Sequence, residues 1–527
     1  MPPDAEISSC DHESTFITSQ SFLERVKAGE ALFIFANKVY KVDSFAARHP
    51  GGEIAIRHGI GHDVTDEIRS MHPASVYNVM MKKFCIGDYL PVPTPLTATR
   101  NTTALPSSTP QQEQTDNKPL IQASWSGRVS VEAFDQSIQE LHQAHAQDLL
   151  LDRLHTQQQK VVDAETMRQK YQALEQDIKD RGLFECNRYR YLKECCRYVF
   201  LLYSSLWMLF RGSCFTHYLI SAICLAGFWH QLYFTAHDAG HNEITGKVET
   251  DHLLGVVVAN FIGGLSLGWW KDNHNVHHIV TNDPENDPDI QHLPFLAIST
   301  RFFQNLYSTY YGRVMAFDAV AKFFVARQHH LYYLVLAFGR FNLHVLSFRY
   351  LLTSKNVRMP RLEWAGIFVF FVWYSTLLAQ LPSWGIRVMY IFVSYMLTFP
   401  LHVQITLSHF GMSTEVVENE PFPARQLRTT MDVDCPIWFD WFHGGLQYQA
   451  VHHLYPRMPR HNLRRCVPLV RQFCRETGLH YYMYNFSTGN GVILGALKSV
   501  ADQVTLMNDV AKYNADIMVD GHSKKLD

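Results

Sequence analysis

Three long stretches of this chain contain no charged residue, and they limit what it can fold into more than any other feature. They are residues 212–236, 364–386 and 388–414. A helix of about 20 apolar residues crosses the hydrocarbon core of a bilayer, where only helices and closed barrels satisfy every backbone group. A shorter apolar run precedes the first stretch, and the arginines beside it can reach the membrane surface. The pattern predicts four transmembrane helices in two hairpins, 198–236 and 364–414.

The rest of the composition indicates that soluble parts are joined to these membrane segments. Hydrophobic residues make up 47% of the chain, yet 18% of its residues are charged. The net charge of −2 gives no reason to expect nucleic acid as a partner. The ten cysteines form no C-x-x-C pair, which disfavours zinc ribbons and covalently attached haem.

The chain divides into four sections by composition and periodicity. Residues 15–90 alternate short apolar runs with turns, as a small mixed α/β domain does. Residues 91–125 are rich in Pro, Thr, Ser and Gln, so we expect a disordered linker. Residues 126–197 are charged and have helical apolar spacing, which predicts cytosolic amphipathic helices. Residues 198–527 contain the membrane domain.

The first section contains two histidines that fit a haem site. His49 begins the sequence His-Pro-Gly-Gly, and His72 follows in a second predicted loop. Haem b with two axial imidazoles needs histidines that approach the porphyrin from opposite faces. The alternative is an ordinary loop histidine before a turn, and His58 and His62 are expected to be surface residues of that kind. The apolar residues that could line the pocket are Phe33, Phe35, Val39, Phe45, Ile54, Ile56 and Ile68.

The membrane section contains three histidine clusters. They are His237 with His241, His274 with His277 and His278, and Gln449 with His452 and His453. On a helix, residues at i, i+3 and i+4 share one face, so each cluster presents its imidazoles in one direction. Imidazole is a good ligand for iron. One such cluster is weak evidence, but three with helical hairpins between them predict a metal centre.

The apolar segment 253–270 decides whether these clusters can meet. If it crossed the bilayer, the first two clusters would lie on opposite faces of the membrane. We therefore expect it to be interfacial or re-entrant. Basic residues before the first hairpin place that side in the cytosol; they are Arg188, Arg190, Lys193 and Arg197. Two hairpins then return all three clusters to the cytosolic side.

Other polar residues near the clusters are less specific, and most of them have two interpretations. Asp238 and Asp272 could orient ligand imidazoles or could be solvated carboxylates. The acidic run 282–289 is expected to be a turn. The basic run 456–465 could bind lipid headgroups, but we expect it to lie on anionic lipid. His402 is expected to be a buried polar or substrate-facing group.

These motifs resemble two known families. His49-Pro-Gly-Gly, Asp63-x-Thr65 and His72 resemble a cytochrome b5 domain. The three histidine clusters resemble the membrane fatty-acid and sphingolipid desaturases, and the Gln of the third cluster is typical of the cytochrome b5-fused, front-end branch. Within that branch the segments 440–449 and 452–465 are most similar to fungal Δ8 sphingolipid desaturases.

There is one departure from that pattern. Position 451 is Val, where many relatives have an acidic residue. Because Val451 lies between Gln449 and the histidine pair, it need not abolish metal binding, but it weakens the assignment to a subfamily.

The resemblance implies haem b bound by His49 and His72, two iron ions, and O2 as co-substrate. It also implies an additional ligand, His409, at the end of the last apolar stretch; the alternative is a histidine bonded to a backbone carbonyl at the membrane interface. The implied iron ligands are His237, His241, His274, His277, His278, His409, Gln449, His452 and His453.

The expected fold is an α+β cytochrome b5-like domain followed by an all-α membrane domain of four transmembrane helices, with a cytosolic helical cap that carries the di-iron site. The resemblance implies a multi-pass protein of the endoplasmic reticulum membrane, reduced by NADH-cytochrome b5 reductase. It would introduce a Δ8 double bond into the long-chain base of ceramide. The alternatives are a Δ5 or Δ6 acyl desaturase, a lipid hydroxylase, and an electron carrier whose histidine clusters are inert.

Overall fold

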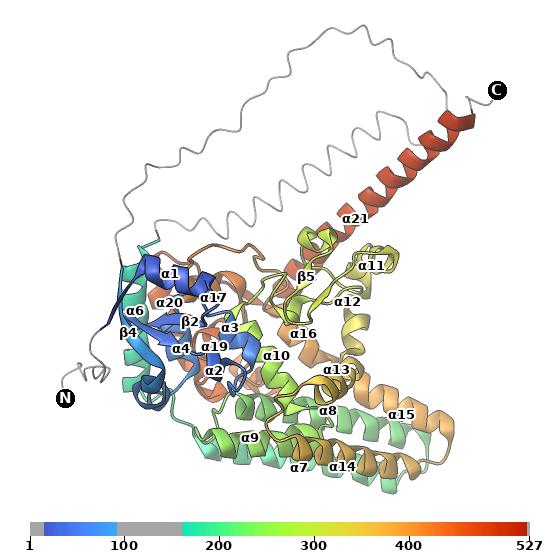
Figure 1. The fold of residues 1–527 in the computed structure, drawn as a ribbon. Helices are drawn as coiled ribbons and strands as arrows, with labels where there is room; N and C mark the ends of the chain where they lie inside the picture. The colour runs from blue at the N-terminus through green and yellow to red at the C-terminus, as the bar shows by residue number, and fades with distance from the viewer. Residues whose placement is uncertain (1–14, 92–160, 524–527) are drawn as a thin grey trace.

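The computed structural model describes residues 15–91 and 161–523. The predicted linker, from residue 92 on, and the first part of the predicted amphipathic section lie outside the described residues. The described residues form a small α/β domain that lies against a larger helical body (Figure 1). The long helix α21 (Phe486–Ser523) extends away from this body.

The N-terminal domain is built on a four-stranded sheet of order β1-β4-β3-β2. Strands β1 and β4 are parallel, whereas β3 is antiparallel to both of its neighbours. The strands are β1 (Phe16–Thr18), β2 (Leu32–Phe35), β3 (Lys38–Lys41) and β4 (Cys85–Leu90). The helices are α1 (Ser19–Lys27), α2 (Asp43–Ala46), α3 (Glu53–Arg57), α4 (Thr65–Met71), η1 (Val76–Met80) and η2 (Met81–Phe84).

Side chains alternate between the two faces of this sheet, because successive residues of a strand point in opposite directions. Phe33 and Phe35 pack on the face that carries the histidines. Leu32 and Ile34 pack on the opposite face, and Val39 lies with them. The expectation that Val39 lines the haem pocket is therefore wrong, because its position in β3 turns it to the other side.

The helical body contains the apolar stretches as helices. These are α7 (Arg188–Phe210), α8 (Phe215–Gly240), α14 (Pro360–Ala379), α15 (Trp384–Met396) and α16 (Phe399–Leu407). Of these, α7, α8, α14 and α15 lie side by side (Figure 1). Within the described residues, three segments are long and apolar enough to cross a membrane: α8, α14 and the segment from α15 through α16. Helix α7 packs along α8, but its first half carries charges. The break before α16 lies next to Pro400, which has no backbone N–H to continue the hydrogen bonds of a helix.

The segment 253–270 folds back on itself. It runs from the end of α9 (Val248–Val256) through the π-helix η3 (Val257–Ile262) into the start of α10 (Leu267–Ile279). The chain bends by 116° between the α9–η3 part and α10. This bend places α10 against the C-terminal end of α8. The first two histidine clusters are therefore adjacent, which is the outcome that the re-entrant interpretation required.

A second bent pair was not expected from the sequence. Helix α12 (Gln328–Ala337) meets α13 (Gly339–Thr353) at 63°. At the bend, Gly339 lies so close to His402 that an added Cβ would be 2.7 Å from the imidazole. If each bent pair counts as one span, the described part of the chain has up to five spans.

A further set of elements forms a cap beside α8 and α10. The elements of this cap are α6 (Ala164–Asp180), α17 (Phe422–Thr429), α18 (Asp440–His443), α19 (Gln449–Leu454), α20 (Arg460–Thr477), β7 (Asp432–Asp434) and β8 (Met483–Asn485). Its helices α6, α17, α19 and α20 share a buried apolar cluster in which α6 packs against α20. Shorter elements are η4 (Pro288–Ile290), η5 (Thr300–Gln304), β5 (Tyr307–Ser308), β6 (Arg313–Val314), α11 (Ala319–Val325) and η6 (Ile437–Phe439).

Candidate haem site and metal centre

The two histidines of the N-terminal domain face each other. His49 lies in the loop after α2, and His72 ends α4; their ring centroids are 5.9 Å apart. Nδ1 of His49 lies 3.0 Å from the carbonyl of Gly52, and Nδ1 of His72 lies 3.2 Å from that of Ile68. Each Nδ1–H can donate to its carbonyl, which leaves Nε2 free to bind a metal.

The surroundings of these two rings fit a haem. Burial lowers the pKa of His72 to about 3, so its imidazole is neutral and can act as a ligand. The rings open onto a cavity of about 1170 Å³, lined by Phe33, Phe45, Ile56 and Ile68 on the side of the small domain. Its other wall belongs to the helical body, so the site lies between the two parts of the chain.

Not every expectation for this pocket is met. Ile54 and Phe35 do not line the cavity. His62 is exposed, as expected, but His58 is half-buried in the cavity wall.

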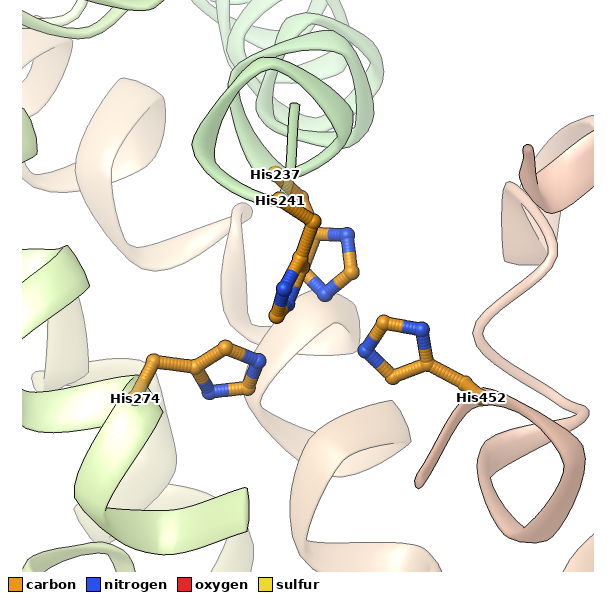
Figure 2. A group of neighbouring side chains, drawn as sticks. All are labelled: His237, His241, His274 and His452. Atoms are coloured by element: carbon orange, nitrogen blue, oxygen red, sulfur yellow. The ribbon is translucent and has the colours of Figure 1, made fainter. Parts of the chain in front are cut away.

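The second histidine site is assembled in the helical body. Figure 2 shows His237 of α8, His241 directly after α8, His274 of α10 and His452 of α19 pointing toward one another. We call these four the first histidine group. Each contributes a ring nitrogen, and these nitrogens all lie within 4.8 Å of one another.

A second histidine group lies beside the first. It consists of His277, His409 and His453, whose nitrogens are also within 4.8 Å of one another. The ring of His278 lies between the groups, 4.6 Å from that of His274 and 4.3 Å from that of His453, measured between centroids. Eight imidazoles therefore converge in two adjacent groups, an arrangement that suits two metal ions.

The free nitrogens of these groups support metal binding. The Nε2 atoms of His241, His452 and His453 are buried and form no hydrogen bond within the described structure. A buried polar atom without a partner is unfavourable. One metal ion in the first histidine group would satisfy His241 and His452, and a second ion in the other group would satisfy His453.

The other nitrogens of the second group are held by fixed acceptors. Nδ1 of His277 lies 2.9 Å from a carboxylate oxygen of Asp287. Nδ1 of His409 lies 3.2 Å from the carbonyl of Thr429 and that of His453 lies 3.0 Å from Oε1 of Gln426. These contacts select the tautomer in which Nε2 is the metal ligand.

The acidic run 282–289 is more than the expected turn. Asp287 is fully buried and bonds His277, while Asp289 lies 3.7 Å from Nδ1 of His274. The turn folds back onto α10 and supplies carboxylates to the ring nitrogens that face away from the centre. Asp287 follows His277 by only ten residues in the sequence. That the chain folds back so that Asp287 contacts His277 is seen only in the structure.

The two aspartates for which orienting a ligand and facing water were both open behave differently. Nδ1 of His237 is 3.7 Å from Asp238, whose carboxylate accepts hydrogen bonds from Arg460 and Tyr191, each at 2.5 Å. Asp272 lies on the side of α10 that faces the small domain, where a Cβ added to Gly52 would meet its carboxylate. Of the two alternatives for Asp272, the structure does not support the orientation of a ligand.

Two arginines of the basic run 456–465 pair with acidic side chains of the same protein. Arg460 is buried and pairs with Glu194 of α7 and Asp238 of α8, which joins the cap to the membrane helices. Arg464 binds Asp440 of α18 at 2.5 Å, within the cap. For these two residues the expected partner, anionic lipid, is replaced by carboxylates.

A second cavity, of about 680 Å³, extends from the metal centre between the helices. Gln449 and His409 line it beside the histidines, and His402 lines it further along α16, as expected for a substrate-facing group. Most of its wall is apolar, including Trp229 and Leu232 of α8. Such a cavity fits a hydrocarbon chain that passes the metals.

Val451 does not face the histidine groups. Its side chain is fully buried in the apolar cluster of the cap, whereas His452 points into the first histidine group. Helical geometry turns position 451 away from the ligands, which explains why an apolar residue is compatible with an intact centre.

Comparison with known proteins agrees with the geometry. Residues 215–485 match the fatty acid desaturase family, and residues 18–90 match the cytochrome b5-like haem/steroid binding domain. The chain belongs to the fatty acid desaturase family, in a form fused to a cytochrome b5-like domain, and is an oxidoreductase that acts on lipids.

Several relatives are similar over nearly the whole chain. The Δ8-(E)-sphingolipid desaturase of Emericella nidulans is 43% identical over 95% of this chain and 97% of its own length. That of Komagataella phaffii is 40% identical over 94% and 95%. The acyl-lipid (9-3)-desaturase of Borago officinalis is 32% identical over 93% and 94%.

Proposed function

We propose that this protein introduces a Δ8 double bond into the long-chain base of ceramide. The observation that carries the proposal is the convergence of eight buried imidazoles beside an apolar cavity, in a chain that aligns end to end with two Δ8-(E)-sphingolipid desaturases. The higher identity to these proteins than to the acyl-lipid desaturase favours a sphingolipid substrate.

The ligand residues follow from the geometry of the two groups. One iron would be held by the first histidine group and the other by the second, with His278 between them and Gln449 beside them. His49 and His72 would hold haem b. When bound, the irons supply O2-dependent removal of two hydrogens from the lipid chain, and the haem supplies electrons one at a time.

The protein itself positions the lipid and excludes water. Trp229 and Leu232 line the cavity with apolar surface, so a saturated chain gains free energy by leaving water. Asp287 and Gln426 keep His277 and His453 in fixed orientations, so the ligands need no rearrangement when the chain binds.

The proposed function also requires a particular arrangement in the membrane. We place the protein in the endoplasmic reticulum membrane with α7 as a fourth span paired with α8, so that the haem domain and the cap share the cytosolic side. An NADH-cytochrome b5 reductase would reduce the haem there. The supporting observation is that α7 packs along the whole of a membrane-length helix.

The proposal can be tested in a yeast that has no Δ8 desaturase of its own and expresses this chain. Its sphingolipids are analysed by mass spectrometry. We expect a new double bond in the long-chain base, and we expect none from the His452→Ala variant, which loses a ligand of the first histidine group. A new double bond in fatty acids alone would keep the reaction and replace the substrate by an acyl lipid, as in the relative from Borago officinalis. Haem-bound protein without non-haem iron and without a new lipid would support the electron-carrier alternative.

A further inference from the structure

The small domain contacts the helix that carries the second histidine cluster. Helix α3 packs on α10, and Nδ2 of Asn275 donates a hydrogen bond to the carbonyl of Gly51 at 3.0 Å. The next residue, Gly52, has φ +98°, and an added Cβ would lie 2.6 Å from a carboxylate oxygen of Asp272. The backbone of the haem loop therefore approaches α10 as closely as a glycine permits.

Other contacts fix the opposite side of the small domain. Arg69 of α4 pairs with Glu175 of α6 at 3.1 Å, and Asp63 pairs with Arg168 of α6 at 2.9 Å. Oγ of Ser70 donates to the carbonyl of Leu454 at 2.8 Å, and both residues are buried. Contacts on two sides hold the domain in one orientation relative to the metal centre.

The Gly51–Asn275 hydrogen bond joins the two metal-binding sites by a short path. Nδ1 of His49 lies 3.0 Å from the carbonyl of Gly52, and Gly52 follows Gly51 directly in the chain. Asn275 likewise follows His274 directly. Two hydrogen bonds, the peptide unit between Gly51 and Gly52, the side chain of Asn275 and one further peptide unit therefore connect the imidazole of His49 to the backbone of His274.

A second path exists on the other side of the haem site, but it is longer at its beginning. Ser70 is two residues before His72, and Leu454 follows His453. An electron on this path must pass through two peptide units before it reaches the Ser70–Leu454 hydrogen bond. The path through Asn275 leaves the imidazole of His49 by a hydrogen bond and crosses a single peptide unit before it reaches the Gly51–Asn275 hydrogen bond.

We infer that electrons pass from the haem to the metal centre through the Gly51–Asn275 hydrogen bond, with Asn275 as a positioning residue for this transfer. This inference rests on the proposed function. Each passage oxidises one ferrous haem iron to ferric and reduces one ferric ion of the metal centre to ferrous. Two passages reduce both ions, and an external one-electron donor reduces the haem again between them. Asn275 keeps its amide protons throughout.

The test follows the haem rather than the lipid product. Full-length protein with haem and non-haem ferric iron is photoreduced anaerobically with a deazaflavin, and the decay of ferrous haem is recorded by absorbance. In the wild type we expect decay as the electron reaches the non-haem iron. Asn275→Leu should slow this decay about tenfold, equivalent to about 1.4 kcal/mol in the barrier. Asn275→Gln, which keeps an amide donor, should recover part of the rate.

Ser70→Ala is the matched control, because it removes a hydrogen bond from the same interface on the other path. We expect its decay rate to equal that of the wild type. Asn275→Leu must keep the wild-type haem spectrum, midpoint potential and non-haem iron content, which a general loss of structure would change. A wild-type decay rate in Asn275→Leu, or a slower decay in Ser70→Ala than in Asn275→Leu, overturns the inference.

The same experiment separates this inference from the proposed function. Wild-type protein that forms the lipid product but shows no decay of ferrous haem would overturn the inference and leave the function intact. Wild-type protein with both metals that neither oxidises its haem nor forms the product would overturn both.

Discussion

The proposed haem site and the proposed metal centre are both built from histidines, but they are built differently. In the small domain, His49 and His72 are close in sequence, and backbone carbonyls accept from their Nδ1 atoms. In the helical body, ligands come from α8, α10, α19 and the end of α16, and several are oriented by side chains such as Asp287 and Gln426. One site is local and held by its own loops, whereas the other is assembled from distant segments.

This difference shows where each site is vulnerable. A hydrogen bond to a backbone carbonyl persists through most substitutions, so the haem site depends on the fold of one small domain. The metal centre depends on side chains of the acidic turn and the cap, each of which a single mutation can remove. The two sites should therefore respond separately to substitutions, and in different ways.

The largest expected effect is complete loss of one cofactor without the other. His49→Ala should lose haem and retain non-haem iron, whereas His452→Ala should lose non-haem iron and retain haem, because the two sites share no ligand. Both variants should lose lipid desaturation entirely. Haem absorbance and colorimetric iron analysis of the purified proteins measure the two contents. Loss of both cofactors from one variant would show that the sites are not independent.

A large loss of stability is expected where the helical body buries charge. Arg460→Met leaves Glu194 and Asp238 buried without their cation, which costs about 3–5 kcal/mol for pairs of this kind. Thermal unfolding in detergent measures the change. Arg25→Met, which removes an ion pair to Glu30 at the surface of the small domain, is the control and should have almost no effect. Equal losses of thermal stability from Arg460→Met and Arg25→Met would contradict the expectation that the buried charges of the helical body matter more than the surface ion pair of the small domain.

A moderate effect is expected at the acidic turn. Asp287→Asn keeps the shape of the side chain but weakens its bond to His277, and we expect metal affinity or activity to fall about 10–100-fold. Competition with a chelator measures the affinity. Asp283→Asn, in the same turn, is the control, because Asp283 bonds Glu285 and Asn286 rather than an imidazole. An unchanged affinity in Asp287→Asn would show that the turn does not hold His277.

The smallest effect is a pH dependence where the two parts of the chain meet. Burial raises the pKa of Glu67 to about 7, and Glu67 lines the cavity between the small domain and the cap. A raised carboxyl pKa stabilises the folded state below the ordinary pKa near 4.5, and this contribution is lost as pH rises through 7. Wild type should therefore lose stability relative to Glu67→Gln between about pH 5 and 8. Parallel pH profiles of thermal unfolding would contradict this.

Much of this organisation was predictable, because the motifs are short and local. The His49-Pro-Gly-Gly loop and the i, i+4 spacing of His237 and His241 depend on turn and helix geometry that a few residues determine. The apolar stretches predicted α8, α14 and the α15–α16 segment for the same reason. His409 was predicted from a family resemblance, and the structure places it in the second histidine group.

What the sequence could not show depends on contacts between distant segments. The charges of Asp287 and Arg460 looked like a solvated turn and a lipid-facing run. Each is buried against a partner from another part of the chain. No local pattern distinguishes a charge that faces water from one that faces a buried partner, and this also hid the contact between Gly51 and Asn275.

The distribution of ligands along the chain has a consequence for how the protein is made. His237 and His274 leave the ribosome well before His409 and His452. Because metal affinity depends on the assembled site, neither histidine group can hold its ion tightly until α19 has been synthesised and has packed over α10. Tight metal binding therefore has to follow the synthesis of α19, and we expect a chain that is truncated before the third cluster to lack tightly bound iron.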